Sequence, residues 1–129
     1  DFVLVACKEL HMKKGSQINA YSALLGREAI YLGSNSVVSY HCLLITSSDD
    51  PRGLRMNDAS PEDMRKVKTA PILIGSKVFI GANSIIMPGV VIGNNSVIGA
   101  GCYIDKDIEN DTVVIPKQEL IYEPRFEYS

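Results

Sequence analysis

The sequence lacks a strong charge of either sign and any long apolar run. Its 129 residues carry 13 basic and 15 acidic side chains, a formal net charge of -2, and a mildly acidic surface attracts neither nucleic acid nor an anionic membrane. No apolar stretch approaches the roughly 20 residues that a membrane-spanning helix needs. These absences exclude a nucleic-acid partner and a membrane span from our expectations.

Cysteine is scarce as well. The three cysteines form no CxxC pair, and an odd number is a poor disulfide framework for a secreted domain. The first residues also lack the basic segment of a signal peptide, although the start at Asp1 leaves room for native residues upstream. We therefore expect one domain over residues 1–129, located in the cytoplasm.

The sequence is rich in a six-residue repeat. From Ile74 it reads as six consecutive hexads, each headed by isoleucine: IGSKVF, IGANSI, IMPGVV, IGNNSV, IGAGCY and IDKDIE. A period of six is neither the 2 of a flat strand nor the 3.6 of a helix, and it indicates short strands bent at regular corners. Aliphatic heads would stack inside the coil, with small fifth-position residues beside them and Gly or Asn at the corners. The prediction is an all-β parallel β-helix.

A looser form of the repeat occupies the N-terminal half. Its heads are Met12, Ile18, Leu24, Leu32, Val38 and Leu44. With three hexads per turn, the chain has about four coils. Two interruptions, near residues 26–28 and over residues 46–71, both follow the third hexad of a turn, so we expect both at one corner of the coil, where function has been inserted.

The last twenty residues do not follow the repeat. Pro116 and Pro124 interrupt the segment from 110 to 129, and proline removes a backbone donor that a strand ladder needs. We expect this segment to form an extended or partly helical cap over the last coil.

The run IGANSIIMPGVVIGNNSVIGAGCYIDKD closely resembles the hexapeptide-repeat acyltransferases. Within that family, LITSSDDPRG followed by a loop and PILIGSKVFIG looks most like the bacterial acetyltransferases that modify surface-polysaccharide sugars. The resemblance implies a left-handed coil and a homotrimer with active sites between subunits. It also implies acetyl-coenzyme A as the donor, a small-molecule or glycan acceptor, a histidine base and no metal.

A base near neutral pH is needed because a sugar hydroxyl is barely ionised, and histidine suits this role best. Only His11 and His41 are present. Relatives carry the base where this chain has Ser48 to Asp50, or at the position of Lys77, and neither place holds histidine here. His11 lies at the N-terminal edge, where we expect a solvated surface residue.

His41 is the candidate base. It occupies the fourth position of its hexad, which should point outward, and register stacks it between Tyr21 and Asn83, with Gly101 beyond. We predict that Asp49 or Asp50 orients its ring and that Asn83 holds the acceptor or the developing oxyanion. The alternatives are that His41 is an ordinary surface or trimer-interface residue and that the two aspartates form a polar turn.

Donor binding requires close approach to the backbone and cations for the phosphates. Small residues match family positions beside the donor groove, or are simply corners of the coil: Gly81, Ala82, Gly99, Ala100 and Gly101. Lys106 and Lys117 match lysines that relatives keep near the donor. Both lysines are therefore candidates for contacting phosphate.

The predicted function is acetyl transfer from acetyl-coenzyme A to a sugar hydroxyl in surface-polysaccharide biosynthesis. N-acetylation of a nucleotide-linked amino sugar is one alternative, and a catalytically silent scaffold subunit is another. A zinc-dependent hydratase on the same fold would need about three histidines per site, and the chain has two. We therefore expect no metal.

Overall fold

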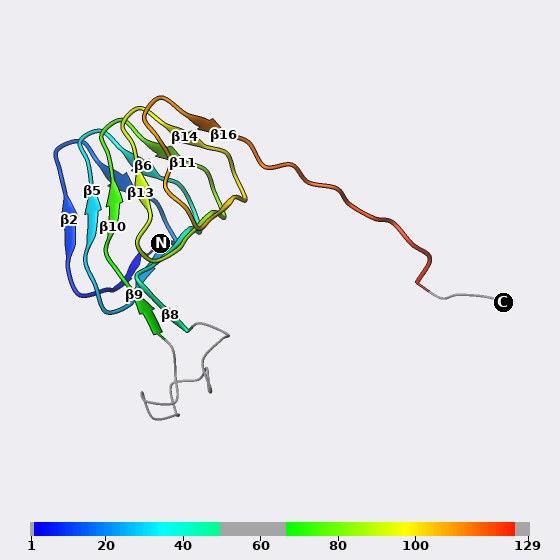
Figure 1. Ribbon diagram of the computed structural model, residues 1–129, viewed down its shortest axis with the longest axis horizontal. Helices are drawn as coiled ribbons and strands as arrows, with labels where there is room; N and C mark the ends of the chain where they lie inside the picture. The colour runs from blue at the N-terminus through cyan, green and yellow to red at the C-terminus, as the bar shows by residue number, and fades with distance from the viewer. Residues whose placement is uncertain (1, 50–66, 126–129) are drawn as a thin grey trace.

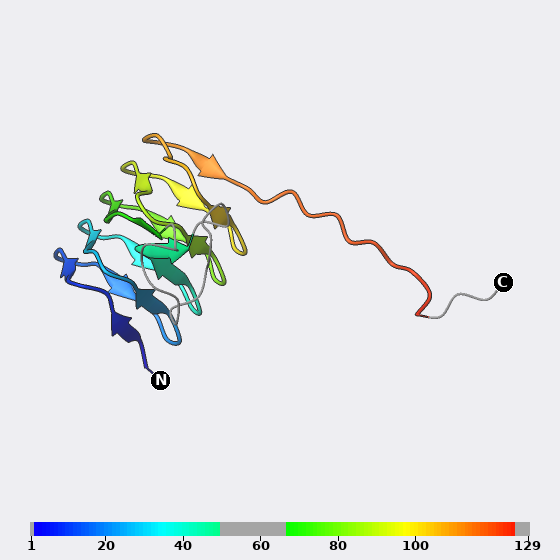
Figure 2. The same cartoon turned by 60° about the horizontal axis from the view of Figure 1, so that its bottom comes forward.

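The computed structural model describes residues 2–49 and 67–125. Within these ranges every regular element is a short strand, and none of the described residues forms a helix able to cross a membrane. The chain passes repeatedly through three parallel sheets, A, B and C, and so builds a three-sided coil (Figures 1 and 2). The predicted parallel β-helix is confirmed.

Sheets A and C take one strand from each of the five coils, and sheet B takes one from each of the first four. Sheet A contains β1 (Leu4–Ala6), β4 (Ala23–Leu25), β7 (Leu43–Ile45), β12 (Ile85–Ile86) and β15 (Tyr103–Ile104). Sheet B contains β2 (Leu10–Met12), β5 (Ile30–Leu32), β10 (Ile72–Ile74) and β13 (Val91–Ile92). Sheet C contains β3 (Gln17–Ile18), β6 (Val37–Val38), β11 (Phe79–Ile80), β14 (Val97–Ile98) and β16 (Val113–Val114).

The described residues make five coils, one more than the sequence predicted. The additional strands are β1 at the N-terminal end and β16 at the C-terminal end. Ile108 forms a parallel bridge to Ile92 and completes the fifth coil on sheet B. Val114 pairs with Ile98. The coil thus continues past residue 110, although the sequence there no longer shows the regular six-residue pattern.

The predicted heads from Leu24 to Ile104 form the interior, whereas Met12 in the first coil is 45% exposed. In sheet A, Leu24, Leu44, Ile86 and Ile104 lie in register and are buried. Burying each such side chain contributes about 1.5–3 kcal/mol before conformational entropy is subtracted. The small fifth-position residues are also buried, and Ser36 donates its hydroxyl to the carbonyl of Gly75 at 2.6 Å. A narrow apolar stack with satisfied hydroxyls therefore replaces a large globular core.

The corners are named here by the sheets they join, in chain order: A–B, B–C and C–A. At the B–C and C–A corners the third of four turn residues has a φ between 57° and 79°. Its side chain, where present, lies outside the coil, and the residue after it is small and turned inward. The fourth position of each hexad thus faces outward, as predicted.

Both interruptions lie at the A–B corner, as expected. Residues 26–29 connect β4 to β5, and the longer insertion begins after β7 and returns at β10. The Arg27 amide donates to the Ser47 hydroxyl at 2.8 Å, and the Glu28 amide donates to the Thr46 hydroxyl at 3.1 Å. The insertion leaves the coil as an antiparallel hairpin of β8 (Ser47–Asp49) and β9 (Val67–Thr69). Ser48, predicted as an interior fifth residue, lies in this hairpin instead.

The expected C-terminal cap is wrong for the described residues. Residues 113–114 belong to the last coil, and the chain beyond them runs away from the prism (Figures 1 and 2). Ile115 is 77% exposed. Pro116 has no amide to donate to a further ladder, so the coil ends at this point.

Candidate functional site

The C–A corner carries a column of outward side chains in successive coils. Backbone bonds fix its register: the amides of His41, Asn83 and Gly101 donate to the carbonyl of the second corner residue one coil earlier, at 3.0, 3.1 and 2.8 Å. Tyr21 precedes His41 in the column, and all four residues have a positive φ. The predicted order, Tyr21, His41, Asn83 and Gly101, is confirmed.

His41 and Asn83 are joined by a side-chain hydrogen bond. Nδ1 of His41 donates to Oδ1 of Asn83 at 2.8 Å. An amide oxygen only accepts, so Nδ1 carries a proton in this contact, and a neutral ring bonded in this way has its lone pair on Nε2. In the described part of the chain no hydrogen bond engages Nε2. His41 therefore has the tautomer and the exposure that a general base requires.

This bond joins two of the residues singled out in the sequence. Asn83 was predicted to hold the acceptor or the oxyanion, and its carbonyl oxygen contacts His41 here. Its amide N–H groups are separate donors, so the predicted role stays a prediction. Asp49 was a candidate for orienting the His41 ring. It ends β8, where its backbone pairs with Val67 at the A–B corner, one strand of sheet A away from the C–A corner. Asp50, the other candidate, lies outside the described residues.

A cavity of about 260 Å³ lies beside the histidine. Its lining consists of Tyr21, His41, Leu43, Asn83 and Ile85. Leu43 and Ile85 face outward from β7 and β12, where they are paired in register. Neither residue is predicted from the sequence as part of the site, although both are the sixth-position neighbours of the corner. The cavity therefore has a polar rim on the corner and an apolar floor on sheet A.

The small residues proposed for donor binding lie at the same corner as His41. Gly81 and Ala82 precede Asn83, and Gly99 and Ala100 precede Gly101. A Cβ on Gly81 would be 2.5 Å from the backbone nitrogen of Ala100, so this glycine is required by the packing of the coil. Gly101 differs, because a Cβ there would meet nothing within 4 Å. Its missing side chain leaves open space above Asn83.

The two candidate lysines lie in different places. Lys106 belongs to the A–B corner of the last coil, after β15. Lys117 follows Pro116, whose Cδ lies 3.0 Å from the position of a Cβ on Gly99. The C–A corner therefore has Lys117 near its C-terminal end, whereas Lys106 is separated from it by one strand of sheet A.

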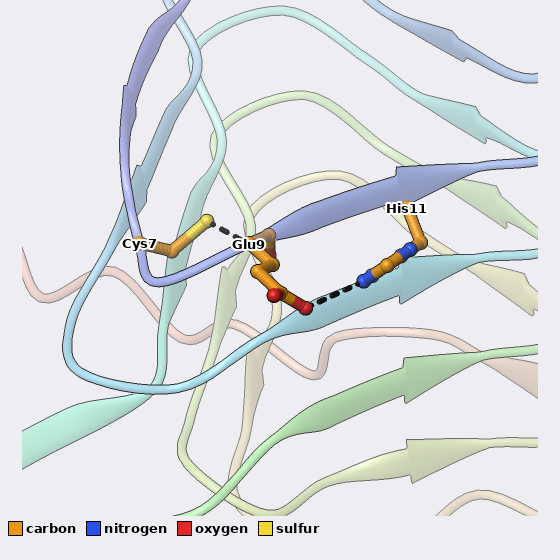
Figure 3. Close-up of polar contacts among 3 residues, drawn as sticks. All are labelled: Cys7, Glu9 and His11. Atoms are coloured by element: carbon orange, nitrogen blue, oxygen red, sulfur yellow. Dashed lines mark hydrogen bonds and ion pairs between the residues drawn. The ribbon is translucent and has the colours of Figure 1, made fainter.

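His11 lies on another face of the coil. It points outward from β2 in sheet B, and its Nε2 lies 2.9 Å from a carboxylate oxygen of Glu9 (Figure 3). Its ring stacks on Tyr31 with centroids 4.7 Å apart. The hydrogen bond from His11, and then its charge, lower the pKa of Glu9. His11 is exposed, as expected, and takes no part in the C–A corner.

The described residues contain no group of three or more His, Cys, Asp or Glu side chains placed to hold a metal ion. The groups at the C–A corner are an imidazole, an amide, an aromatic ring and small residues.

Comparison with known families tests the repeat directly. The profile of the bacterial transferase hexapeptide family (six repeats) matches residues 71–106. These residues include β10 to β15, which fold as consecutive turns of the coil. This chain is a hexapeptide-repeat protein. Its repeats supply both Asn83 and the small residues of the C–A corner.

The hexapeptide-repeat protein is similar to several curated proteins. It is 36% identical over 102 residues to the bifunctional protein GlmU of Methanococcus vannielii, covering 74% of this chain and 24% of that protein. It is 28% identical over 102 residues to the putative lipopolysaccharide biosynthesis O-acetyl transferase WbbJ of Escherichia coli K12, covering 76% of this chain and 52% of that protein. The chain thus spans about a quarter to about half of the length of these relatives.

A solved structure is similar over nearly the whole hexapeptide-repeat protein. AntD, an N-acyltransferase from Bacillus cereus in complex with dTDP and 3-hydroxybutyryl-CoA, is 29% identical, with a TM-score of 0.82. The match covers 97% of this chain and 68% of that chain. The likeness extends to both sides of the insertion at residues 50–66.

Proposed function

We propose that this chain transfers an acetyl group from acetyl-coenzyme A to a sugar hydroxyl, with His41 as the general base. The observation that carries the proposal is the 2.8 Å bond from His41 Nδ1 to Asn83 Oδ1 beside a cavity. It leaves Nε2 as the proton acceptor. The relative WbbJ, named as a putative O-acetyl transferase, and the neighbour AntD, named as an N-acyltransferase, support an acyl-transfer reaction.

The proposed reaction has two steps. Nε2 of His41 takes the proton from the acceptor hydroxyl while the oxygen attacks the thioester carbonyl, which gives a tetrahedral oxyanion. The carbon–sulfur bond then breaks, the ester is released, and the leaving thiolate takes the proton from the imidazolium. Asn83 holds the ring through Nδ1 and stabilises the imidazolium, because its amide oxygen carries partial negative charge.

The donor would lie along the C–A corner. Gly101 offers open space next to Asn83 in the column, where the thioester could approach Nε2. Ala82 and Ala100 add little bulk on either side, and Lys117 supplies a cation near the end of the corner for a phosphate. Lys106 would contact the donor only if the donor spans sheet A. The donor-binding roles proposed here are assigned from where each residue lies relative to His41.

The cellular setting is part of the proposal. Resemblance to the surface-polysaccharide acetyltransferases favours a homotrimer with the acceptor between subunits, acting in the cytoplasm on a polysaccharide precursor. The similarity to WbbJ, named for lipopolysaccharide biosynthesis, supports this setting.

N-acetylation of a nucleotide-linked amino sugar is a second candidate. AntD is an N-acyltransferase, and a variant of it has been solved with dTDP-4-amino-4,6-dideoxyglucose and coenzyme A. The same His41 could take a proton from the attacking nitrogen. A panel that offers matched hydroxy and amino sugars to the protein separates the two candidates.

The test of the proposed function is binding followed by turnover. Calorimetry should show coenzyme A binding, and release of free thiol from acetyl-coenzyme A should depend on an added sugar. No coenzyme A binding and no sugar-dependent thiol release would instead favour the silent scaffold subunit.

A further inference from the structure

Tyr21 occupies a backbone position that suits its side chain poorly. It is the third residue of its C–A turn, with a φ of 64°. A bulky residue in this left-handed region is unusual, because its Cβ crowds the backbone. Such strain is often retained where a side chain serves a function.

The B–C corner offers an internal comparison, because its third residues have the same backbone conformation. They are Gly15, Asn35, Lys77, Asn95 and Asp111. Four of these five are Gly, Asn or Asp, the types that tolerate a positive φ best. At the C–A corner the same position instead holds two rings in adjacent coils, Tyr21 and His41. The coil does not require an aromatic residue there.

The ring of Tyr21 is placed beside the cavity. It meets Phe2 edge-on, with centroids 5.5 Å apart and planes at 83°, and its side chain lines the hollow shared with His41. His11 and Tyr31, which also lie in adjacent coils, instead stack at 4.7 Å with parallel rings. Tyr21 is 51% exposed. Its ring therefore forms one wall of an open pocket, above the floor made by Leu43 and Ile85.

The column gives the pocket two unlike ends. Beyond Asn83, Gly101 leaves open space, which suits a thin thioester arm. Before His41, Tyr21 provides an aromatic surface, and the floor at Leu43 and Ile85 is apolar. Successive coils are about 4.8 Å apart. A ligand that packs against the Tyr21 ring could therefore place a group on its own edge next to His41.

We propose that Tyr21 is a specificity-determining residue that selects acceptors with a rigid C–H face, as in a pyranose ring. The inference rests on the proposed acetyl transfer. One face of the sugar packs against the Tyr21 ring and the apolar floor, while a hydroxyl at its rim meets Nε2 of His41. An acceptor with the same hydroxyls and no ring would lose this contact.

The experiment measures acceptor kinetics for three variants. Tyr21→Asn removes the ring and suits the positive φ, Tyr21→Phe keeps the ring, and Tyr31→Asn removes an exposed tyrosine from sheet B as the matched control. The acceptor probes are the methyl pyranosides of glucose, galactose and mannose, with open-chain glucitol for comparison. Thermal melting checks that each variant is folded.

The wild-type chain should acetylate at least one pyranoside in preference to glucitol. Tyr21→Asn should raise the KM for that pyranoside about 5- to 10-fold, in line with the loss of a stacking contact, with the KM for acetyl-coenzyme A unchanged. Tyr21→Phe and Tyr31→Asn should stay within about twofold.

An unchanged pyranoside KM in folded Tyr21→Asn would overturn the role of Tyr21 while leaving acetyl transfer in place. So would a wild-type preference for glucitol. Absence of coenzyme A binding together with no transfer to any acceptor by the wild-type chain would overturn acetyl transfer itself and, with it, this inference.

Discussion

At the scale of single residues, the period of six is sufficient to place His41 beside Asn83. Both are fourth-position residues of hexads in adjacent coils, and the structure confirms that neighbourhood. The hydrogen bond between them could not be predicted, because register fixes backbone positions and leaves side-chain torsions open. The sequence instead predicts Asp49 or Asp50 as the group that orients the ring.

Replacing His41 tests the base. His41→Ala should lower kcat by about 10²- to 10⁴-fold, the usual contribution of general base catalysis, with little change in coenzyme A affinity. His11→Ala is the matched control, because His11 lies on sheet B and pairs with Glu9. Wild-type turnover in His41→Ala, measured by thiol release with the best acceptor, would exclude His41 as the base.

Replacing Asn83 tests the orientation of the ring. Asn83→Ala should lower kcat about tenfold, since the imidazole loses the acceptor that fixes its tautomer. Asn83→Asp should retain more activity because a carboxylate oxygen can also accept from Nδ1. Asn95→Ala removes an asparagine with the same φ of 61° from the B–C corner. Equal losses of kcat in the two alanine variants would show a structural effect rather than an orienting one.

At the scale of the strand and corner, the hexad predicts burial well. Heads and fifth-position residues lie inside from Leu24 to Ile104, as the pattern indicated. Strands β1 and β16 were not predicted, because their sequences do not show the six-residue pattern. Edge strands can join a ladder through backbone hydrogen bonds alone. The prediction that Ser48 is an interior fifth-position residue was also wrong. Ser48 lies in a hairpin, which satisfies backbone hydrogen-bonding groups as well as a further turn of the coil would.

The packing of successive coils at the C–A corner explains why position 81 holds glycine. Gly81→Ala should lower the free energy of unfolding by about 3 kcal/mol, because the new methyl group overlaps the backbone of Ala100. Gly101→Ala should cost about 1 kcal/mol from its positive φ alone, since its surroundings are empty. Chemical denaturation of the two variants measures the difference. A larger loss for Gly101→Ala would contradict this packing.

The buried column of Ser22, Cys42, Ser84 and Cys102 allows a second test. Sγ of Cys42 lies 3.2 Å from the carbonyl of Gly81, much as Ser84 bonds to Gly99. Cys42→Ser should therefore change stability by less than about 1 kcal/mol at neutral pH.

Burial raises the pKa of the Cys42 thiol above its ordinary 9.0. The folded state thus holds the proton more tightly than the unfolded state, and the stability that Cys42 contributes falls as the pH rises above 9.0. Urea unfolding across this pH range should show a shallower decline for Cys42→Ser. An identical decline in both proteins would refute the linkage.

At the scale of the whole molecule, the insertion and the candidate base occupy different corners. The sequence placed both interruptions at one corner correctly, and it therefore suggested that function would be inserted there. Strand β7 lies between them, because His41 precedes that strand and the insertion follows it. Sheet A, with Leu43 and Ile85 on its outer face, lies between the two corners. An acceptor at His41 would therefore lie on that sheet.

The most direct measurement is a crystal structure of this chain with coenzyme A. We predict that the sulfur lies at the C–A corner within reach of Nε2 of His41, about 3 Å away or joined to it by one water, close enough for proton transfer in the complex. A coenzyme A sulfur at the A–B corner, or on sheet B beside His11, would contradict the assignment of His41 as the base.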